Sequence, residues 1–414
     1  MSRELEVKVV LSVSLAVPVL ITAYKYLVPY ISEKLTKPTR DQKDYGKVTP
    51  LYITPEDVKT YNDRPWRPFR WPHKQTMALV KMDMNHWLDI TLHYWKFQKG
   101  KTEIFENYDP EKLKTNTFLR TVEGFDNEYN ELRDVVIEQL TTRYPLLFKR
   151  KGKLVYNNLM NEVYDIEKEP PLIIISKMAM EDFYIVQKKA DGLNYCIGAT
   201  VAFPGGGFGI LQLMDKPLDF IHKTVPYYED KLKPSMEKWF GKFVDGVERV
   251  SWHIVWEENL NCSELYPVSK EMTHEEAKKY VMTIPFEEFR VRMECQSLTK
   301  LPKTKAIIFA NHPKFIKLTE LEYEPYMPSF VMNMMYECPE EIMKQKHFEL
   351  VREHLRPRLQ RMIDNQIANG LIESDSLTNL RTPPTYPFAH WMSTDWDYHK
   401  GWTSPYKNMV TSSL

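Results

Sequence analysis

The chain has 414 residues, of which 43% are apolar and 27% are charged, a balance typical of a globular protein with a substantial core. Lys plus Arg and Asp plus Glu number 56 each, so the net charge gives no reason to expect a nucleic-acid-binding surface. The four cysteines form no C-x-x-C pair, which argues against a zinc knuckle, an iron–sulfur cluster and a cofactor attached through C-x-x-C-H. Free thiols of this kind fit a reducing compartment, although pairing in an oxidising one stays open.

The N-terminal segment from Val9 to Ile31 is almost free of charge, and Lys25 is its one charged residue. Because about 20 apolar residues cross a bilayer core, residues 1–31 are predicted to form a membrane anchor. A cleaved signal peptide and a buried helix are the alternatives, disfavoured because the segment lacks a small-residue cleavage site and a polar face. Basic residues are more frequent after the segment than before it. This predicts a single-pass membrane protein with a cytosolic globular domain, on an internal membrane such as the endoplasmic reticulum.

Composition also predicts the domain boundaries. Residues 32–72 are polar and rich in proline, as expected of an extended linker. Residues 73–373 are predicted to form the folded domain, and its last part, 318–370, has a helical pattern that Gly370 ends as a C-cap. Residues 374–414 contain tryptophans among polar residues and are predicted to be a tail that lies against the domain.

The order of elements in the domain predicts an α+β fold. Helical spacing of apolar residues begins after a cap at Asp83 or Asn85 and recurs over residues 123–144. Two strand-like runs then form a hairpin around Asp191-Gly192, two helices follow, and three strands end the series. This order is that of a PAS domain, with an antiparallel five-stranded sheet and flanking helices. The predicted strands are residues 181–188, 193–203, 247–256, 289–298 and 305–310, and the helices between them are 218–225 and 227–243.

Several common active-site signatures are missing from the sequence. Gly205-Gly206-Gly207 is followed by no Lys-Ser/Thr pair and belongs to no G-x-G-x-x-G unit, so we interpret it as a turn. There is no G-x-S-x-G elbow and no H-E-x-x-H helix. His86 and His93, seven residues apart beside aromatic side chains, are interpreted as part of a packing face rather than as metal ligands.

His222 differs from these histidines because it lies in a short apolar helix between the predicted hairpin and the last three strands. A haem in such a fold needs one neutral imidazole on a helix that faces an apolar sheet. The ring nitrogen binds the iron, and the sheet excludes water from the macrocycle. His222 is therefore a candidate haem ligand. Its spacing alone does not decide this, and the other interpretation is that His222 binds no ligand.

Short motifs follow one another in a characteristic order over residues 65–365. They are Arg67-Pro68-Phe69-Arg70-Trp71, Gln75 to Leu79, Lys81-Met82-Asp83 with Trp87, Glu181-Asp182, Ala202-Phe203-Pro204, Ile221-His222 with Val225-Pro226, Trp252, Arg292 with Glu294 and Gln296, and Leu301-Pro302. In this order they resemble the haem-dependent oxidative N-demethylase family, alpha-subunit-like. The resemblance implies a PAS-like, haem-binding domain, here in a membrane-anchored version.

The resemblance also implies roles for individual residues. His222 becomes the proximal ligand of the haem iron. The other residues that it places around the cofactor are Phe203, Pro204, Ile221, Val225 and Trp252. Arg292, Glu294 and Gln296 are implied to be the catalytic polar residues on the distal side, while an alternating, solvent-exposed face of a strand is the other interpretation.

The sequence departs from the family's pattern at two positions. Cys295 stands where the family usually has Arg, and Ser251 stands where it usually has Asn before the strand Trp. Hydrogen-bond donors on the distal side polarise bound oxygen, so both departures favour a protein that binds haem without turnover.

The predicted function is that of a haem-dependent mono-oxygenase-like protein, with oxidative N-demethylation of a small amine as the candidate chemistry. The chain has no flavin or nicotinamide fingerprint, so a separate electron-donating reductase is predicted as its partner. A non-catalytic haem-binding sensor or carrier on a membrane is the alternative. A haem-free structural membrane protein is the third interpretation.

Overall fold

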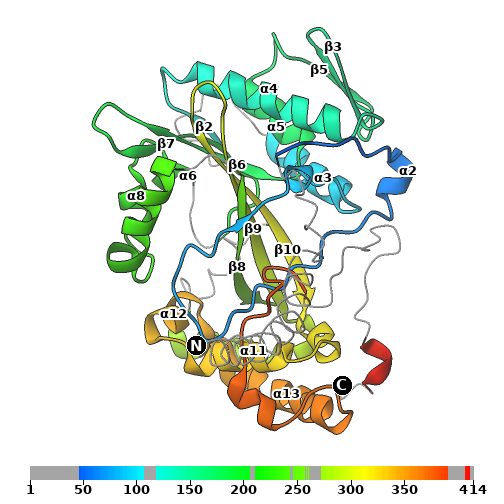
Figure 1. The fold of residues 1–414 in the computed structure, drawn as a ribbon, viewed down its shortest axis with the longest axis vertical. Helices are drawn as coiled ribbons and strands as arrows, with labels where there is room; N and C mark the ends of the chain where they lie inside the picture. Colours follow the sequence, from blue (N-terminus) through cyan, green and yellow to red (C-terminus); the bar gives the residue numbers. More distant parts are fainter. Residues whose placement is uncertain are drawn as a thin grey trace, which may run out of the picture. The chain divides into compact units, whose positions relative to one another are not determined.

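One large antiparallel sheet organises the domain (Figure 1). The computed structural model describes residues 46–106, 118–205, 210–242, 246–256, 258, 260, 272–389 and 406–410. Over these residues the sheet has seven strands. In spatial order they are β1 (Val80–Lys81), β8 (Val247–Val255), β9 (Arg290–Lys300), β10 (Ile307–Lys317), β6 (Asp182–Lys188), β7 (Asn194–Thr200) and β2 (Leu119–Thr121).

A smaller antiparallel sheet joins β3 (Phe148–Lys151), β4 (Leu154–Asn157) and β5 (Glu162–Asp165). Its first turn contains Gly152, whose φ of 59° is in the left-handed region that favours glycine. The helical elements are α2 (Pro55–Val58), η1 (Met84–His86), α3 (Tyr94–Phe105), α4 (Asp126–Arg143), α5 (Pro171–Met178), α6 (Ile210–Leu213), α7 (Leu218–His222), η3 (Tyr228–Leu232), α8 (Lys233–Lys242), α10 (His274–Val281), η5 (Phe286–Glu288), η6 (Leu318–Tyr323), α11 (Met327–Glu337), α12 (Glu340–Gln345), α13 (Phe348–Ala368), η7 (Asp375–Asn379) and η8 (Lys407–Met409).

This topology corrects the predicted fold class of a PAS-like, five-stranded sheet. The five predicted strands are present and adjacent, in the order β8-β9-β10-β6-β7, but β1 and β2 extend the sheet in the described part of the chain. These edge strands are two and three residues long, too short to carry an alternating apolar pattern. The three-stranded sheet was not predicted either, because its outer strands β3 and β5 are largely exposed and β3 reads Phe-Lys-Arg-Lys.

The predicted membrane helix is corrected as well. No helix in the part of the chain that the structure describes is long and apolar enough to cross a membrane. This finding contradicts the predicted single-pass membrane protein, and that localisation is not retained. The predicted anchor over Val9 to Ile31 itself lies outside the described residues, as do the tryptophans of the predicted tail. The domain boundaries at residues 72 and 373 stay predictions.

The two faces of the large sheet differ because side chains alternate along each strand. One face packs against helices through two apolar clusters. In the first cluster, α4 and α5 contribute Leu132 and Ile174, which pack with Phe183 of β6. In the second, α11 and α13 cover β8 and β9, where Trp252 and Val291 are buried. Figure 1 shows these helix groups at opposite ends of the long strands.

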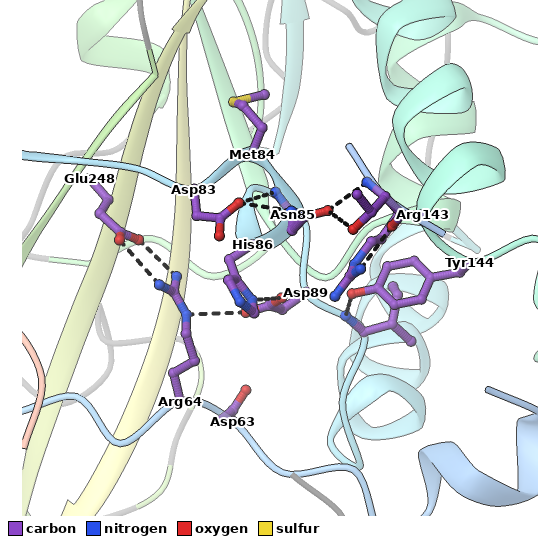
Figure 2. A network of polar contacts seen from close by, with 12 residues as sticks. Asp63, Arg64, Asp83, Met84, Asn85, His86, Asp89, Arg143, Tyr144 and Glu248 are labelled. Atoms are coloured by element: carbon purple, nitrogen blue, oxygen red, sulfur yellow. Dashed lines mark hydrogen bonds and ion pairs between the residues drawn. The ribbon is translucent and has the colours of Figure 1, made fainter. Parts of the chain in front are cut away.

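A buried group of charged residues on the same face of the sheet holds the chain that precedes α3 (Figure 2). Arg64 donates two hydrogen bonds to the Glu248 carboxylate of β8, at 3.1 and 2.7 Å, and its Nε lies 3.4 Å from Asp89 Oδ2. His86 Nδ1 lies 2.9 Å from the other oxygen of Asp89. Because buried charges are costly unless they are paired, these contacts stabilise one arrangement of residues 64–89 on the sheet.

A second buried ion pair joins the segment before β1 to the chain after η6. Arg67 Nε donates to Glu324 Oε2 at 2.7 Å, and the two side chains are only 2% and 1% exposed. Next to it, the Ala389 N–H donates to the Pro65 carbonyl at 2.8 Å. Described parts of the predicted linker and of the predicted tail therefore pack against each other.

Glu324→Gln removes the negative charge of this pair while it preserves the size of the side chain. We expect the free energy of unfolding to fall by about 3–5 kcal/mol, because the Arg67 charge stays buried without its compensating carboxylate. Urea denaturation of the full chain measures this change. Glu56→Gln, in the exposed Lys59–Glu56 pair, is the control and should cost less than about 1 kcal/mol. Equal effects of the two substitutions would contradict the role of the buried pair.

Candidate functional site

The face of the sheet opposite the two apolar clusters borders a cavity of about 330 Å³. This volume is within the range of about 300–1,000 Å³ that is usual for small-molecule sites. The sheet contributes Tyr184, Phe309 and Leu298, and the helices α7 and α8 contribute Leu218 and Phe240. The walls are therefore largely apolar, and polar side chains occur at a few defined positions.

His222 enters this cavity from the last position of α7. Its Nδ1 lies 2.8 Å from the Leu218 carbonyl oxygen, one helical turn earlier. A carbonyl can only accept a hydrogen bond, so Nδ1 carries the proton and Nε2 keeps its lone pair. Among the described residues Nε2 has no hydrogen-bond partner. The helix thus presents an imidazole in the tautomer that can bind a metal through Nε2.

Neighbouring residues fix the ring and keep it neutral. Tyr228 stacks on His222 with 5.3 Å between ring centroids, and its hydroxyl donates to Asp219 at 2.6 Å. Lys233 pairs with the same carboxylate at 2.9 Å. Burial lowers the pKa of His222 below its ordinary value, so the neutral form that can coordinate a metal predominates at neutral pH.

A polar patch occupies the sheet wall of the cavity. Glu294 and Gln296 of β9 and Asn311 of β10 line it. The Glu294 carboxylate accepts a hydrogen bond from Asn311 Nδ2 at 2.6 Å and another from Arg292 Nε at 2.5 Å. Arg292 is fully buried and also donates to the Leu260 carbonyl at 2.7 Å. Glu294 is therefore held in place from two sides, whereas the Gln296 side chain is half-buried at the cavity surface.

The chain after β7 passes unusually close to this patch. The Asp182 carboxylate accepts hydrogen bonds from the backbone N–H groups of Ala202 and Phe203, at 3.0 and 2.8 Å, and so fixes the exit from β7. Three residues after Ala202, a Cβ atom added to Gly205 would lie 2.2 Å from a Glu294 carboxylate oxygen. Only glycine leaves room for the carboxylate in its present position.

The structure brings together six of the nine predicted site residues at the cavity. They are Ile221, His222, Val225, Trp252, Glu294 and Gln296. Trp252 borders the cavity, but its ring packs on the other side against Phe69 and Phe348, with centroids 5.1 and 5.6 Å away. Phe203, Pro204 and Arg292 do not line the cavity. Phe203 packs instead on Phe97, and Arg292 donates a hydrogen bond to Glu294.

The two departures from the family pattern lie on different faces of the sheet. Ser251 is paired in register with Glu294 and lines the cavity. Cys295 is the next residue after Glu294 on β9, so its thiol points to the opposite face, where it is buried in the apolar cluster that covers β8 and β9. Of the two, only Ser251 can change the chemistry of the cavity directly.

Sequence reasoning missed several polar residues that line the cavity. Asn311 lies on β10, beyond the end of the strand predicted over residues 305–310. Arg249 is two residues before Ser251 on β8, and strand alternation alone could have placed it on the same face. Arg70 and Lys346 come from segments outside the predicted sheet, and no periodic pattern indicated that they would meet there.

Among the described residues, no three His, Cys, Asp or Glu side chains converge to hold a metal ion by themselves. In the part of the chain that the structure describes, the fold and site define an α+β protein with a ligand cavity lined by two imidazoles, His222 and His73, and the Leu218 carbonyl fixes His222 in the tautomer that can bind a metal. The family described as "Haem-dependent oxidative N-demethylase, alpha subunit-like" matches residues 78–356, about two thirds of the chain. The chain belongs to this family. A comparison with curated proteins found no match.

A haem fits the residues that are present at this site. Its iron needs one protein nitrogen, because the porphyrin supplies four others, and His222 offers Nε2 while its Nδ1–H is held by a carbonyl. Apolar side chains of the wall, Leu218 and Phe309 among them, suit contact with a largely apolar macrocycle. Together, His222 and these walls are the residues of this chain that could hold the cofactor.

Gly205→Ala tests the packing of the site. The added methyl group forces the Glu294 carboxylate or the chain after β7 to move, so we expect a loss of about 1–3 kcal/mol in the free energy of unfolding. Chemical denaturation of the full chain measures it. Gly241→Ala, on α8 with nothing within 4 Å of the added atom, is the matched control and should leave stability unchanged or slightly higher. Equal stability of the Gly205 variant and the wild type would show that the two groups do not meet.

Proposed function

We propose that the protein is a haem-dependent mono-oxygenase-like enzyme that oxidatively demethylates a small amine, with electrons from a separate reductase. Membership of the haem-dependent oxidative N-demethylase, alpha-subunit-like family supports this proposal. One structural observation carries it: the Nδ1–H of His222 is held by the Leu218 carbonyl, which leaves Nε2 for a metal in a cavity of suitable size.

In this proposal, each side of the cavity has its own task. His222 on the helix side holds the iron, and the Leu218 carbonyl keeps the imidazole in the correct tautomer. The bound haem supplies the capacity to bind and activate oxygen when it is reduced. The apolar side chains around the cavity, Leu298 and Phe309 among them, exclude bulk water from the reaction.

The sheet side of the cavity binds and orients the substrate. Glu294 carries a negative charge that attracts a protonated amine, and Arg292 with Asn311 holds the carboxylate in one position. Gln296 offers a carboxamide that can donate or accept a hydrogen bond at the cavity surface. Arg292 is thus a positioning residue, while Glu294 and Gln296 contact the ligand.

The electrons have to come from another protein, because the chain contains no flavin or nicotinamide fingerprint. The family description, alpha subunit-like, fits a protein that works with further subunits. A haem-binding sensor or carrier is the second candidate. Ser251 favours it, since this position of the cavity wall carries a smaller side chain than the Asn of the family pattern.

Turnover of small N-methyl amines tests the proposed reaction. The haem-loaded full chain is reduced under oxygen by a surrogate reductase in the presence of secondary and tertiary N-methyl amines. We expect formaldehyde release and amine-dependent consumption of reductant. Stable haem binding without formaldehyde for any amine of the panel would overturn the enzymatic proposal and favour the sensor.

Gln296→Leu tests whether the sheet wall of the cavity takes part in this reaction. The substitution keeps the approximate size of the side chain and removes its hydrogen-bonding groups, so we expect kcat to fall about 10²-fold while haem content is unchanged. Ser297→Ala, at the next position of β9 and on the packing face, is the control and should leave kcat unchanged. Equal rates for the Gln296 variant and the wild type would exclude a role for this residue in turnover.

A further inference from the structure

Basic side chains collect in one part of the cavity wall. Arg70, His73, Arg249 and Lys346 all line the cavity, and they come from the segment before β1, from β8 and from the residue after α12. Glu294 is the one acidic residue among the described residues of the cavity wall, and its carboxylate already accepts hydrogen bonds from two protein side chains. This basic end of the cavity, defined by the four residues, has no acidic counterpart of its own.

Hydrogen bonding at the basic end is incomplete. The Nε atom of Arg249 and the Nε2 atom of His73 are buried and lack a hydrogen-bond partner within the part of the chain that the structure describes. The Tyr386 hydroxyl, whose ring lies 5.6 Å from the Arg70 guanidinium, is also buried without a partner. Buried polar atoms are nearly always satisfied in folded proteins, so these three atoms indicate that something besides the protein completes the site.

The contacts that the basic residues do make leave their charges uncompensated. Lys346 Nζ donates to the Trp252 carbonyl at 2.6 Å, and Arg70 donates to Thr76 Oγ1 at 3.0 Å. Among the described residues, no carboxylate forms an ion pair with Arg70, Arg249 or Lys346. A surface arginine would reach solvent with its whole guanidinium group, but part of the Arg249 guanidinium is enclosed.

Burial makes this arrangement unfavourable when no anion is present. Desolvation lowers the pKa of Arg249, and it lowers the pKa of Lys346 to about 7, with a further contribution from the positive charges of Arg249 and Arg70. Grouped cations in a cavity repel one another and lose hydration, unless an anion enters between them. A protonated amine would also be repelled by an uncompensated basic end.

We propose that the basic end binds the carboxylate groups of the ligand that occupies the cavity, with the two propionates of haem as their source if the proposed function holds. The planar guanidinium groups of Arg249 and Arg70 present paired N–H donors that suit a carboxylate. Lys346 and His73 add further donors to the same wall of the cavity, and the Tyr386 ring lies beside the Arg70 guanidinium. Anionic propionates here neutralise the cavity, so that Glu294 can attract a cationic amine.

Binding of haem and of its dimethyl ester, in which both propionates are esterified, tests this proposal. Affinities are measured on the haem-free full chain by absorbance titration and by tryptophan quenching, so no turnover is needed. We expect the wild type to bind haem about tenfold to a hundredfold more tightly than the ester. Arg249→Gln should lose most of this preference, because it weakens the binding of haem and leaves that of the ester nearly unchanged. Arg249→Lys should restore part of it.

Stability of the ligand-free protein separates this role from a structural one. Because Arg249→Gln removes a partly buried charge that has no carboxylate partner among the described residues, it should raise the unfolding midpoint in the absence of ligand while it weakens ligand binding. Arg361→Gln, at an exposed position of α13, is the matched control and should change neither property. A lower midpoint together with unchanged affinity would mean that Arg249 only supports the fold, and would overturn the proposal.

A small dicarboxylate distinguishes the source of the carboxylate groups. Succinate is titrated into the haem-free wild type and into Arg249→Gln by calorimetry. If Arg249→Gln weakens succinate binding but leaves the difference in affinity between haem and its ester unchanged, the basic end binds a free carboxylate. If the substitution changes neither quantity, the basic end is not a carboxylate site. A wild type that binds no haem at all overturns the proposed function, and the succinate titration then still decides the role of the basic end.

Lys346 gives the carboxylate site a specific pH dependence. Its amine is surrounded by Arg70, Arg249, His73, His253 and Cys338, and its pKa is about 7 without ligand. A bound carboxylate favours the charged form and raises this pKa, so ligand binding takes up a proton between pH 7 and the higher pKa of the complex. Affinity for haem should therefore fall as the pH rises above 7, and Lys346→Met should reduce this dependence. If the affinity for haem falls equally steeply with pH in Lys346→Met and in the wild type, the role assigned to Lys346 is contradicted.

Discussion

Side-chain alternation along β8 and β9 is the constraint on which the rest of the structure depends. Consecutive residues point to opposite faces, so the side chains of Ser251 and Glu294 face the cavity while the Trp252 ring and Cys295 pack in the apolar cluster beneath the helices. A one-residue shift in register would bury polar side chains such as Glu294 in the apolar cluster and turn apolar ones such as Trp252 toward the cavity. Arg292 and Glu294 lie two positions apart on one face of β9, and the hydrogen bond between them holds the Glu294 carboxylate on the cavity side.

The helix predicted to begin after a cap at Asp83 or Asn85 is wrong, because Met84–His86 forms only a 3-10 turn and α3 begins at Tyr94. Many of the longer elements nevertheless follow from the sequence, because their apolar residues repeat with the period of a helix or a strand. The hairpin of β6 and β7, the long helix α4 and the end of α13 near Gly370 are confirmed in this way. The short strands β1 and β2 depend on contacts with β8 and β7 that no local pattern contains. β10 was predicted to end at Ala310, yet its pairing with β9 continues past Pro313 to Lys317.

The candidate site was predicted less completely than the fold. His222 could be singled out because a lone imidazole on a short apolar helix is unusual, and it does line the cavity. Lys346 gave no signal, since a charged residue after a helix normally faces solvent, and the alternation that places Arg249 on the cavity face of β8 does not show that its charge is enclosed. Only the packing of α7, α8 and α12 around the sheet reveals that these charges are enclosed. The roles of the predicted residues in catalysis stay proposals.

One cavity combines three features among the described residues: an imidazole with a free ring nitrogen, a carboxylate held by Arg292 and Asn311, and a basic end without an acid. From these features we propose above all that His222 binds the iron of haem. The most direct measurement is the absorption spectrum of the haem-loaded full chain, wild type beside His222→Ala, with and without added imidazole. We predict one haem per wild-type chain, an altered Soret band in the variant, and its restoration by imidazole. An unchanged spectrum and haem content in His222→Ala would contradict the claim.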